Sequence, residues 1–127
     1  MNNAPSTLME TLGIDIHEAS SDKVIATMPV SPAVHQPFGY LHGGASVALA
    51  ETVASIGATM SLDTSKQLAF GLEINANHIR PKKDGIVTAT ALPIHKGRTT
   101  HVWSISIEDE EGKLICTSRC TVAIVDI

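Results

Sequence analysis

Residues 45–60, ASVALAETVASIGATM, constrain the fold more than any other part of the chain. The segment reads as one long helix, and small or apolar residues occupy nearly every side of it, with alanine at 45, 48, 50, 54 and 58. Neighbouring elements must enclose such a helix on most sides. We therefore expect a core helix held by a curved sheet.

The remaining segments supply the sheet. Residues 5–12 are expected to form a short helix, and residues 31–41, with prolines at 32 and 37, an irregular loop. Alternating and β-branched patterns predict strands over residues 14–18, 23–30, 67–80, 86–94, 101–108 and 113–125. Runs of strands around a single helix indicate an α+β fold with an antiparallel sheet.

One domain, residues 1–127, accounts for the chain, since no repeat, linker or low-complexity tract interrupts it. The strand over 67–80 is expected to place four apolar residues on one face: Leu68, Phe70, Leu72 and Ile74. A sheet that carries a single helix leaves an edge strand and one surface open, which favours pairing with a second copy. We expect a homo-oligomer.

The composition argues against several functional classes. Nine Lys and Arg against thirteen Asp and Glu give a net charge of −4, which disfavours nucleic acid as a partner. No segment has the roughly 20 apolar residues of a membrane span. The first thirteen residues contain no basic residue and no apolar stretch typical of a signal peptide, so we expect a cytoplasmic protein without a membrane partner.

Two cysteines, Cys116 and Cys120, fall in one predicted strand. At ~3.3 Å per residue their Cα atoms lie about 13 Å apart, beyond the ~7 Å limit for a disulfide, so we expect buried free thiols. No set of His, Cys, Asp or Glu residues has the spacing of a zinc site, and we expect no metal. The chain also has no Ser nucleophile elbow and no Walker-type loop.

Glu51 is the residue most informative about function. Its neighbours one turn away, Val47, Ala48, Ala54 and Ser55, include no cation that could pair with it. An unpaired carboxylate inside an apolar helix is costly to bury and is a candidate general base or nucleophile. The alternative is a structural glutamate that faces solvent or meets a distant cation, but the apolar helix favours a functional one.

The triplet His42-Gly43-Gly44 directly precedes the helix. First-turn N–H groups have no partner within a helix, and glycine lets a carbonyl oxygen approach them, as in an oxyanion site. The alternative is a flexible helix entrance. Gly43 and Glu51 are eight residues apart, about 12 Å along a helix at ~1.5 Å per residue. That is too far for both to act on one carbonyl carbon, which predicts a site shared across a dimer.

Basic residues concentrate in residues 80–98, which contain Arg80, Lys82, Lys83, Lys96 and Arg98 against Asp84 alone. They form two clusters, one at the end of a strand and one at the turn after the next strand. If a subunit boundary brings the clusters together, they form a phosphate site for a small anionic ligand. The alternative is an ordinary solvated basic turn.

Two stretches, QPFGYLHGGASVALAETVASIGA and GLEINANHIRP, resemble the hotdog-fold acyl-CoA thioesterases of the phenylacetate-pathway-like superfamily. The chain is most similar to the 1,4-dihydroxy-2-naphthoyl-CoA and 4-hydroxybenzoyl-CoA thioesterase type, over residues 9–124. The resemblance implies a hotdog fold, in which an antiparallel sheet wraps around one long central helix. It also implies hydrolysis of an acyl-CoA, expected to be an aroyl-CoA, with no cofactor, since coenzyme A is part of the substrate.

The resemblance implies a catalytic role for five residues. Glu51 would be the nucleophile or the general base that attacks the thioester. The backbone N–H of Gly43 would polarise the thioester carbonyl, with Gln36 and His42 lining the site. Ser55 would form a hydrogen bond near the leaving thiolate or the hydrolytic water.

The resemblance also implies a coenzyme A site and an assembly. His78 and Arg80 match positions that touch the nucleotide, and Lys96, Gly97 and Arg98 fall where relatives bind phosphates or pantetheine. The expected assembly is a homodimer, paired further into a dimer of dimers. Two other functions stay open: an acyl-thioester hydratase or dehydratase, and a non-catalytic acyl-CoA-binding dimer in which Glu51 is structural.

Overall fold

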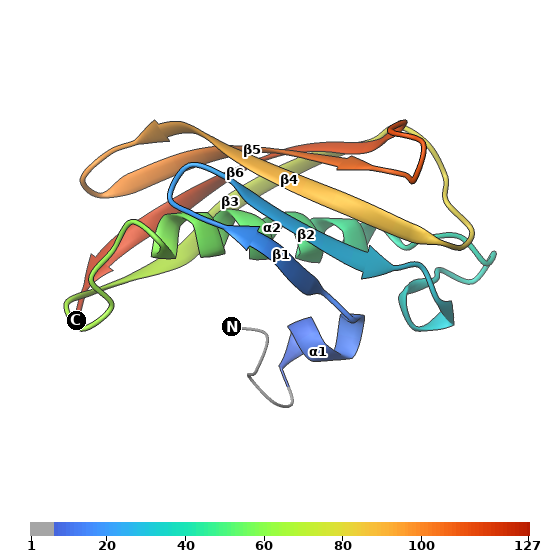
Figure 1. The fold of residues 1–127 in the computed structure, drawn as a ribbon, viewed down its shortest axis with the longest axis horizontal. Coiled ribbons are helices and arrows are strands. Elements are labelled where there is room, and N and C mark those ends of the chain that lie inside the picture. The colour runs from blue at the N-terminus through green and yellow to red at the C-terminus, as the bar shows by residue number, and fades with distance from the viewer. Residues whose placement is uncertain (1–6) are drawn as a thin grey trace.

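A computed structural model describes residues 7–127. Its elements are α1 (Leu8–Leu12), β1 (Asp15–Ala19), β2 (Val24–Pro29), a 3-10 helix (Pro32–Val34), α2 (Gly43–Thr59), β3 (Gln67–His78), β4 (Ile86–Lys96), β5 (Thr100–Glu108) and β6 (Leu114–Asp126). Six antiparallel strands accompany one long helix (Figure 1), so the predicted α+β class is confirmed.

The strands form one sheet in the order β1-β2-β4-β5-β6-β3, so β1 and β3 are its edges. The sheet curves over α2 (Figure 1), and alternate residues of β2, β4, β5 and β6 are buried against it. Trp103 of β5 is fully buried, and its ring lies where a side chain at Gly57 of α2 would be. Small helix residues therefore let the sheet approach α2 closely.

The sheet covers only part of the α2 surface. Leu49, Val53 and Ala54 are fully buried beneath it. A half-buried strip of α2 residues lies between α1 and the edge strand β3; we call it the open strip, and it consists of Ala48, Glu51, Thr52 and Ser55. As predicted, neighbouring elements enclose α2 on most sides, and the side that stays open carries the Glu51 carboxylate.

The strand boundaries differ from the predicted ones by one or two residues, and three further differences concern the helices and the loop. The helix predicted over residues 5–12 is α1, Leu8–Leu12, with residues 5 and 6 outside the described part. The predicted loop over 31–41 contains a 3-10 turn, because proline is well suited to a first helical position. The long helix begins at Gly43, two residues earlier than expected, because His42 caps it.

The prediction that Leu68, Phe70, Leu72 and Ile74 share one face of β3 is wrong. The pairing of β3 with β6 shifts register between Gly71 and Glu73, which is a β-bulge. An extra residue reverses the alternation, so Ile74 packs against the core while Phe70 is exposed. Gly71 lies at this bulge, beside the middle of α2.

Candidate active site

The start of α2 leaves one backbone donor free. The His42 carbonyl accepts hydrogen bonds from the amides of Ala45 and Ser46, and His42 Nδ1 accepts one from Gly44 at 2.7 Å. Within residues 7–127, Gly43 N–H is the first-turn amide of α2 that has no acceptor. It also lies at the positive end of the helix dipole, where an oxygen that carries negative charge is stabilised.

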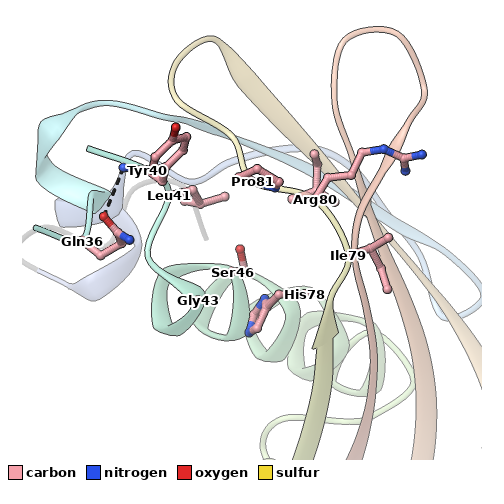
Figure 2. Close-up of a pocket in the computed structure, with 10 residues that line it drawn as sticks. Gln36, Tyr40, Leu41, Gly43, Ser46, His78, Ile79, Arg80 and Pro81 are labelled. Atoms are coloured by element: carbon pink, nitrogen blue, oxygen red, sulfur yellow. Dashed lines mark hydrogen bonds between the residues drawn. The ribbon is translucent and has the colours of Figure 1, made fainter. Parts of the chain in front are cut away.

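A pocket of about 380 Å³ opens beside this amide (Figure 2). It is lined by Gln36, Tyr40, Leu41, Gly43, Ser46, His78, Ile79, Arg80, Pro81 and Ile115. The His78 ring packs against Gly43, with Nε2 2.8 Å from where a Cβ would be, so glycine makes room for the imidazole. Gln36 Oε1 accepts hydrogen bonds from the Phe38 and Tyr40 amides at 2.6 and 3.3 Å, which holds the loop above the pocket.

Glu51 lies farther along α2, on the open strip. Its carboxylate rests against the backbone of Gly71, and a Cβ at that position would overlap Glu51 Oε2. Glu51 makes no ion pair with any residue in the described range. With Ser55 it lines a second depression, of about 440 Å³, whose other wall is formed by Leu8 and Met9 of α1. The carboxylate is therefore supported by β3 and accessible from the α1 side.

The predicted site residues fall into four separate depressions of one chain. Gln36, Gly43, His78 and Arg80 line the first, and Glu51 and Ser55 the second. A third contains His42 and lies between α1 and the start of α2. The fourth contains Lys96, Gly97 and Arg98, near the chain that follows α2. A single chain therefore assembles parts of the predicted site without joining them.

The two basic clusters lie at opposite ends of β4, an eleven-residue strand about 33 Å long at ~3.3 Å per residue. Lys96 Nζ is bound by Asp22 at 2.9 Å and by the Ser21 carbonyl at 3.0 Å. At the other end Arg80 Nη1 donates to the Leu114 carbonyl at 3.0 Å. Arg98 has no partner among the described residues, which leaves it able to bind an anion.

The remaining cations of this segment are also engaged. Lys82 pairs with Glu110 at 2.6 Å. The ammonium and the Ile86 amide hold the pKa of Glu110 at about 2, and the same carboxylate raises the pKa of Lys82. Lys83 Nζ lies 5.6 Å from the Tyr40 ring centre, within the range of a cation–π contact.

Cys116 and Cys120 are buried free thiols, as predicted. Burial, and then the nearby charges of Glu51 and Glu73, raise the pKa of Cys120 to about 11. This thiol is therefore a poor nucleophile at neutral pH. Residues 7–127 contain no group of three or more His, Cys, Asp or Glu side chains arranged to hold a metal ion. None of their helices is long and apolar enough to cross a membrane.

Two residues of the site were not predicted from the sequence: Ser46, which lines the first pocket, and Gly71, which supports Glu51. A glycine inside a strand pattern indicates a bulge or a close approach, so Gly71 did carry a readable signal. Ser46 carried none, because the direction of its hydroxyl depends on packing between α2 and the loop before it.

The sequence pattern of the thioesterase superfamily matches residues 38–116. A 1,4-dihydroxy-2-naphthoyl-CoA hydrolase of Listeria monocytogenes is 55% identical over 117 residues, which cover 92% of this chain and 94% of that protein. A solved structure of a Staphylococcus aureus thioesterase, with one glutamine replaced by alanine, has a TM-score of 0.90 and 51% identity, covering 92% of this chain and 97% of that one.

A second structure of the same Staphylococcus aureus protein, with a glutamate replaced by alanine, has a TM-score of 0.93 and 50% identity over 95% of this chain and all of that one. These similarities and the sheet wrapped around α2 confirm the predicted family and the hotdog fold. The chain is a thioester hydrolase that belongs to the thioesterase superfamily.

Proposed function

We propose that this protein hydrolyses an aroyl-CoA thioester to the free acid and coenzyme A. The observation that carries the proposal is the Glu51 carboxylate, which has no cation partner and is reachable from the open strip of α2. Its relatives add support. The glutamine and glutamate replaced in the Staphylococcus aureus structures are 15 residues apart, as are Gln36 and Glu51.

The Gly43 amide and the Glu51 carboxylate have different roles in the reaction. Gly43 N–H donates to the thioester oxygen and stabilises the negative charge that develops there as the carbonyl carbon becomes tetrahedral. Acting as a base, Glu51 removes a proton from the water that attacks the carbon; the C–S bond then breaks, the thiolate of coenzyme A takes up that proton, and the carboxylic acid remains. Acting as a nucleophile, Glu51 attacks the carbon itself and forms a mixed anhydride as the C–S bond breaks and the thiolate leaves; water then hydrolyses the anhydride to the free acid and the restored carboxylate, and the proton released goes to the thiolate. No metal or separate cofactor takes part.

Two copies of the chain complete the site. Gly43 and Glu51 of one chain are about 12 Å apart along α2, while Glu51 rests on the edge strand β3. That edge exposes Phe70 and Leu72 to 54% and 64%. A second copy paired along β3 covers these side chains and brings its own Gly43 toward Glu51. The dimers then pair further into a tetramer.

The acyl group lies in the groove between α1 and α2. The depression with Glu51 adjoins the third depression, of about 310 Å³, and Leu8 and Ala48 line both. Most residues of the third depression are small or apolar, including Leu12, Val34 and Ala45. A cavity of about 150 Å³ can hold one benzene ring, so this groove has room for an aromatic acyl group of two rings.

The phosphates of coenzyme A lie outside this groove. Arg98 is free to bind them, and Arg80 lines the pocket at Gly43. Because these two residues lie at opposite ends of β4, they contact one nucleotide only when they come from different subunits. His78 and the Lys96-Gly97 turn lie beside the same coenzyme A nucleotide.

The first test measures thiol release from benzoyl-CoA, 1,4-dihydroxy-2-naphthoyl-CoA, phenylacetyl-CoA and a fatty acyl-CoA. We expect the aroyl esters to be preferred and Glu51→Gln to lower kcat by about 10³-fold or more. Glu108→Gln, at an exposed glutamate at the end of β5, is the control and should keep full activity. Full activity of Glu51→Gln would refute the proposed function.

The shared site has its own test. Proline is tolerated at the first helical position and has no N–H, so Gly43→Pro removes the donor and preserves α2. Its ring also displaces the His78 imidazole, which lies beside Gly43 in the same chain, so the variant inactivates this end of the site as a whole. When this inactive variant is refolded together with inactive Glu51→Gln, each heterodimer regains one intact site, and about a quarter of the wild-type activity returns. No recovery in the mixture, or a stable monomer in sedimentation, would contradict the shared site.

A further inference from the structure

Ser46 is a buried polar residue whose hydroxyl has no partner. Its side chain is 1% exposed, and no described residue forms a hydrogen bond with its Oγ. The hydroxyl lines the pocket beside Gly43, and Figure 2 shows it pointing away from α2, toward Leu41 and Pro81. The fully buried polar side-chain atoms without a partner in residues 7–127 are His101 Nδ1 and Trp103 Nε1, whereas Ser46 Oγ opens to the pocket, where a ligand oxygen can accept its proton.

The two threonines of α2 behave differently. Thr52 Oγ1 donates to the Ala48 carbonyl and Thr59 Oγ1 to the Ser55 carbonyl, both at 2.7 Å and one turn back. Ser46 does not form the corresponding bond to the His42 carbonyl, which already accepts the amides of Ala45 and Ser46. Its proton is therefore available to the pocket.

The geometry of a helix places this hydroxyl beside the free amide. Ser46 follows Gly43 by three residues, and side chains three apart share one face of a helix, about 5–6 Å apart at Cβ. Helical side chains also lean toward the N-terminus, over the preceding turn. Gly43 has no side chain and the His78 ring lies where its Cβ would be, so the two donors and this imidazole line one pocket.

We propose that Ser46 Oγ–H is a second donor to the thioester oxygen, alongside Gly43 N–H. The inference rests on the proposed thioester hydrolysis and names one further catalytic residue for it. As the carbonyl carbon becomes tetrahedral, its oxygen accepts one hydrogen bond from the backbone and one from the hydroxyl. The charge on that oxygen grows in the transition state, so the second bond accelerates the reaction more than it improves substrate binding.

The test compares Ser46→Ala with Ser118→Ala. Both serines are buried, but Ser118 Oγ already donates to the Asn75 carbonyl at 2.8 Å. For Ser46→Ala, with benzoyl-CoA as substrate, we expect kcat to fall about 100-fold with KM unchanged. Its Tm should stay equal or rise, because an unpaired hydroxyl is removed. Ser118→Ala should lower Tm by about 4 °C and leave kcat unchanged.

The outcomes separate this inference from the proposed function. If Glu51→Gln is inactive while Ser46→Ala keeps the wild-type kcat, hydrolysis stands and the role of Ser46 is wrong. A raised KM with unchanged kcat would place the hydroxyl on the coenzyme A arm and overturn the inference as well. A fall in Tm with kcat unchanged would make Ser46 structural. If Glu51→Gln retains full activity, the proposed function itself fails.

Discussion

Gly71→Ala tests whether the observed position of Glu51 is the one used in catalysis. The new Cβ would overlap Glu51 Oε2 and lie 2.8 Å from Cδ and 3.2 Å from Cγ. Carbon atoms in good contact are about 3.5–4.0 Å apart, so the carboxylate must move by about 1 Å. A misplacement of about 1 Å can cost 100-fold in rate, and we expect kcat for aroyl-CoA to fall by about that factor.

The same substitution should hardly change the free energy of unfolding. The displaced group is the flexible end of a side chain, and leaving a favoured rotamer costs about 0.5–1.5 kcal/mol. Replacing glycine by alanine in a strand recovers roughly 0.5–1 kcal/mol, since Gly71 is not among the glycines with positive φ. The net change in unfolding free energy therefore stays within about 1 kcal/mol.

Gly57→Ala is the matched control, for which we expect the opposite result: the free energy of unfolding falls while the rate of thiol release hardly changes. Its Cβ would lie 2.7 and 2.8 Å from ring carbons of Trp103, which is rigid and fully buried. Overpacking of this kind costs about 1–3 kcal/mol of unfolding free energy, measured in urea, while thiol release per folded enzyme stays within a few-fold. If Gly71→Ala kept the wild-type kcat, the carboxylate would act from another position and the reasoning would be refuted.

Two more predictions concern the basic residues and a buried histidine. Arg98→Ala should raise KM for CoA esters about tenfold more than KM for pantetheine thioesters, whereas Lys96→Ala should matter less because Asp22 already binds its ammonium; equal effects on both substrates would exclude Arg98 from the phosphate site. Burial, and then the charges of Lys96 and His95, lower the pKa of His101, so the unfolded chain binds that proton more readily. The His101 contribution to stability is complete above the ordinary value of 6.5 and is lost as pH falls below it. His101→Gln should flatten this part of the urea-midpoint profile, and an unchanged slope would contradict the prediction.

Local patterns in the sequence were enough to predict the helices and strands, and to identify the carboxylate at one end of the site and the free amides at the other. The small and apolar residues of the long helix predict a core helix, because their chemistry alone decides that water is excluded from most sides. Glu51 stands out against that background, and the glycines after His42 mark a helix start with free amides. Each of these signals lies within a few residues, where spacing determines geometry.

The tertiary structure decided what depends on contacts between distant segments. The bulge at Gly71 reverses the faces of β3, and the pairing of β3 with β6, which makes β3 an edge, cannot be derived from alternation. Packing against the loop before α2 leaves the Ser46 hydroxyl without a partner.

The net charge of the chain also does not indicate which cations are free to bind an anion. Asp22 binds Lys96 and Glu110 binds Lys82, across 74 and 28 residues of sequence, while Arg98 stays unpaired among the described residues. The sequence by itself determined the helix, the strands and the reactive residue types, because these follow from local periodicity and side-chain chemistry. Only the fold decided which polar groups remain unsatisfied, because hydrogen-bond partners come from segments far apart in the chain.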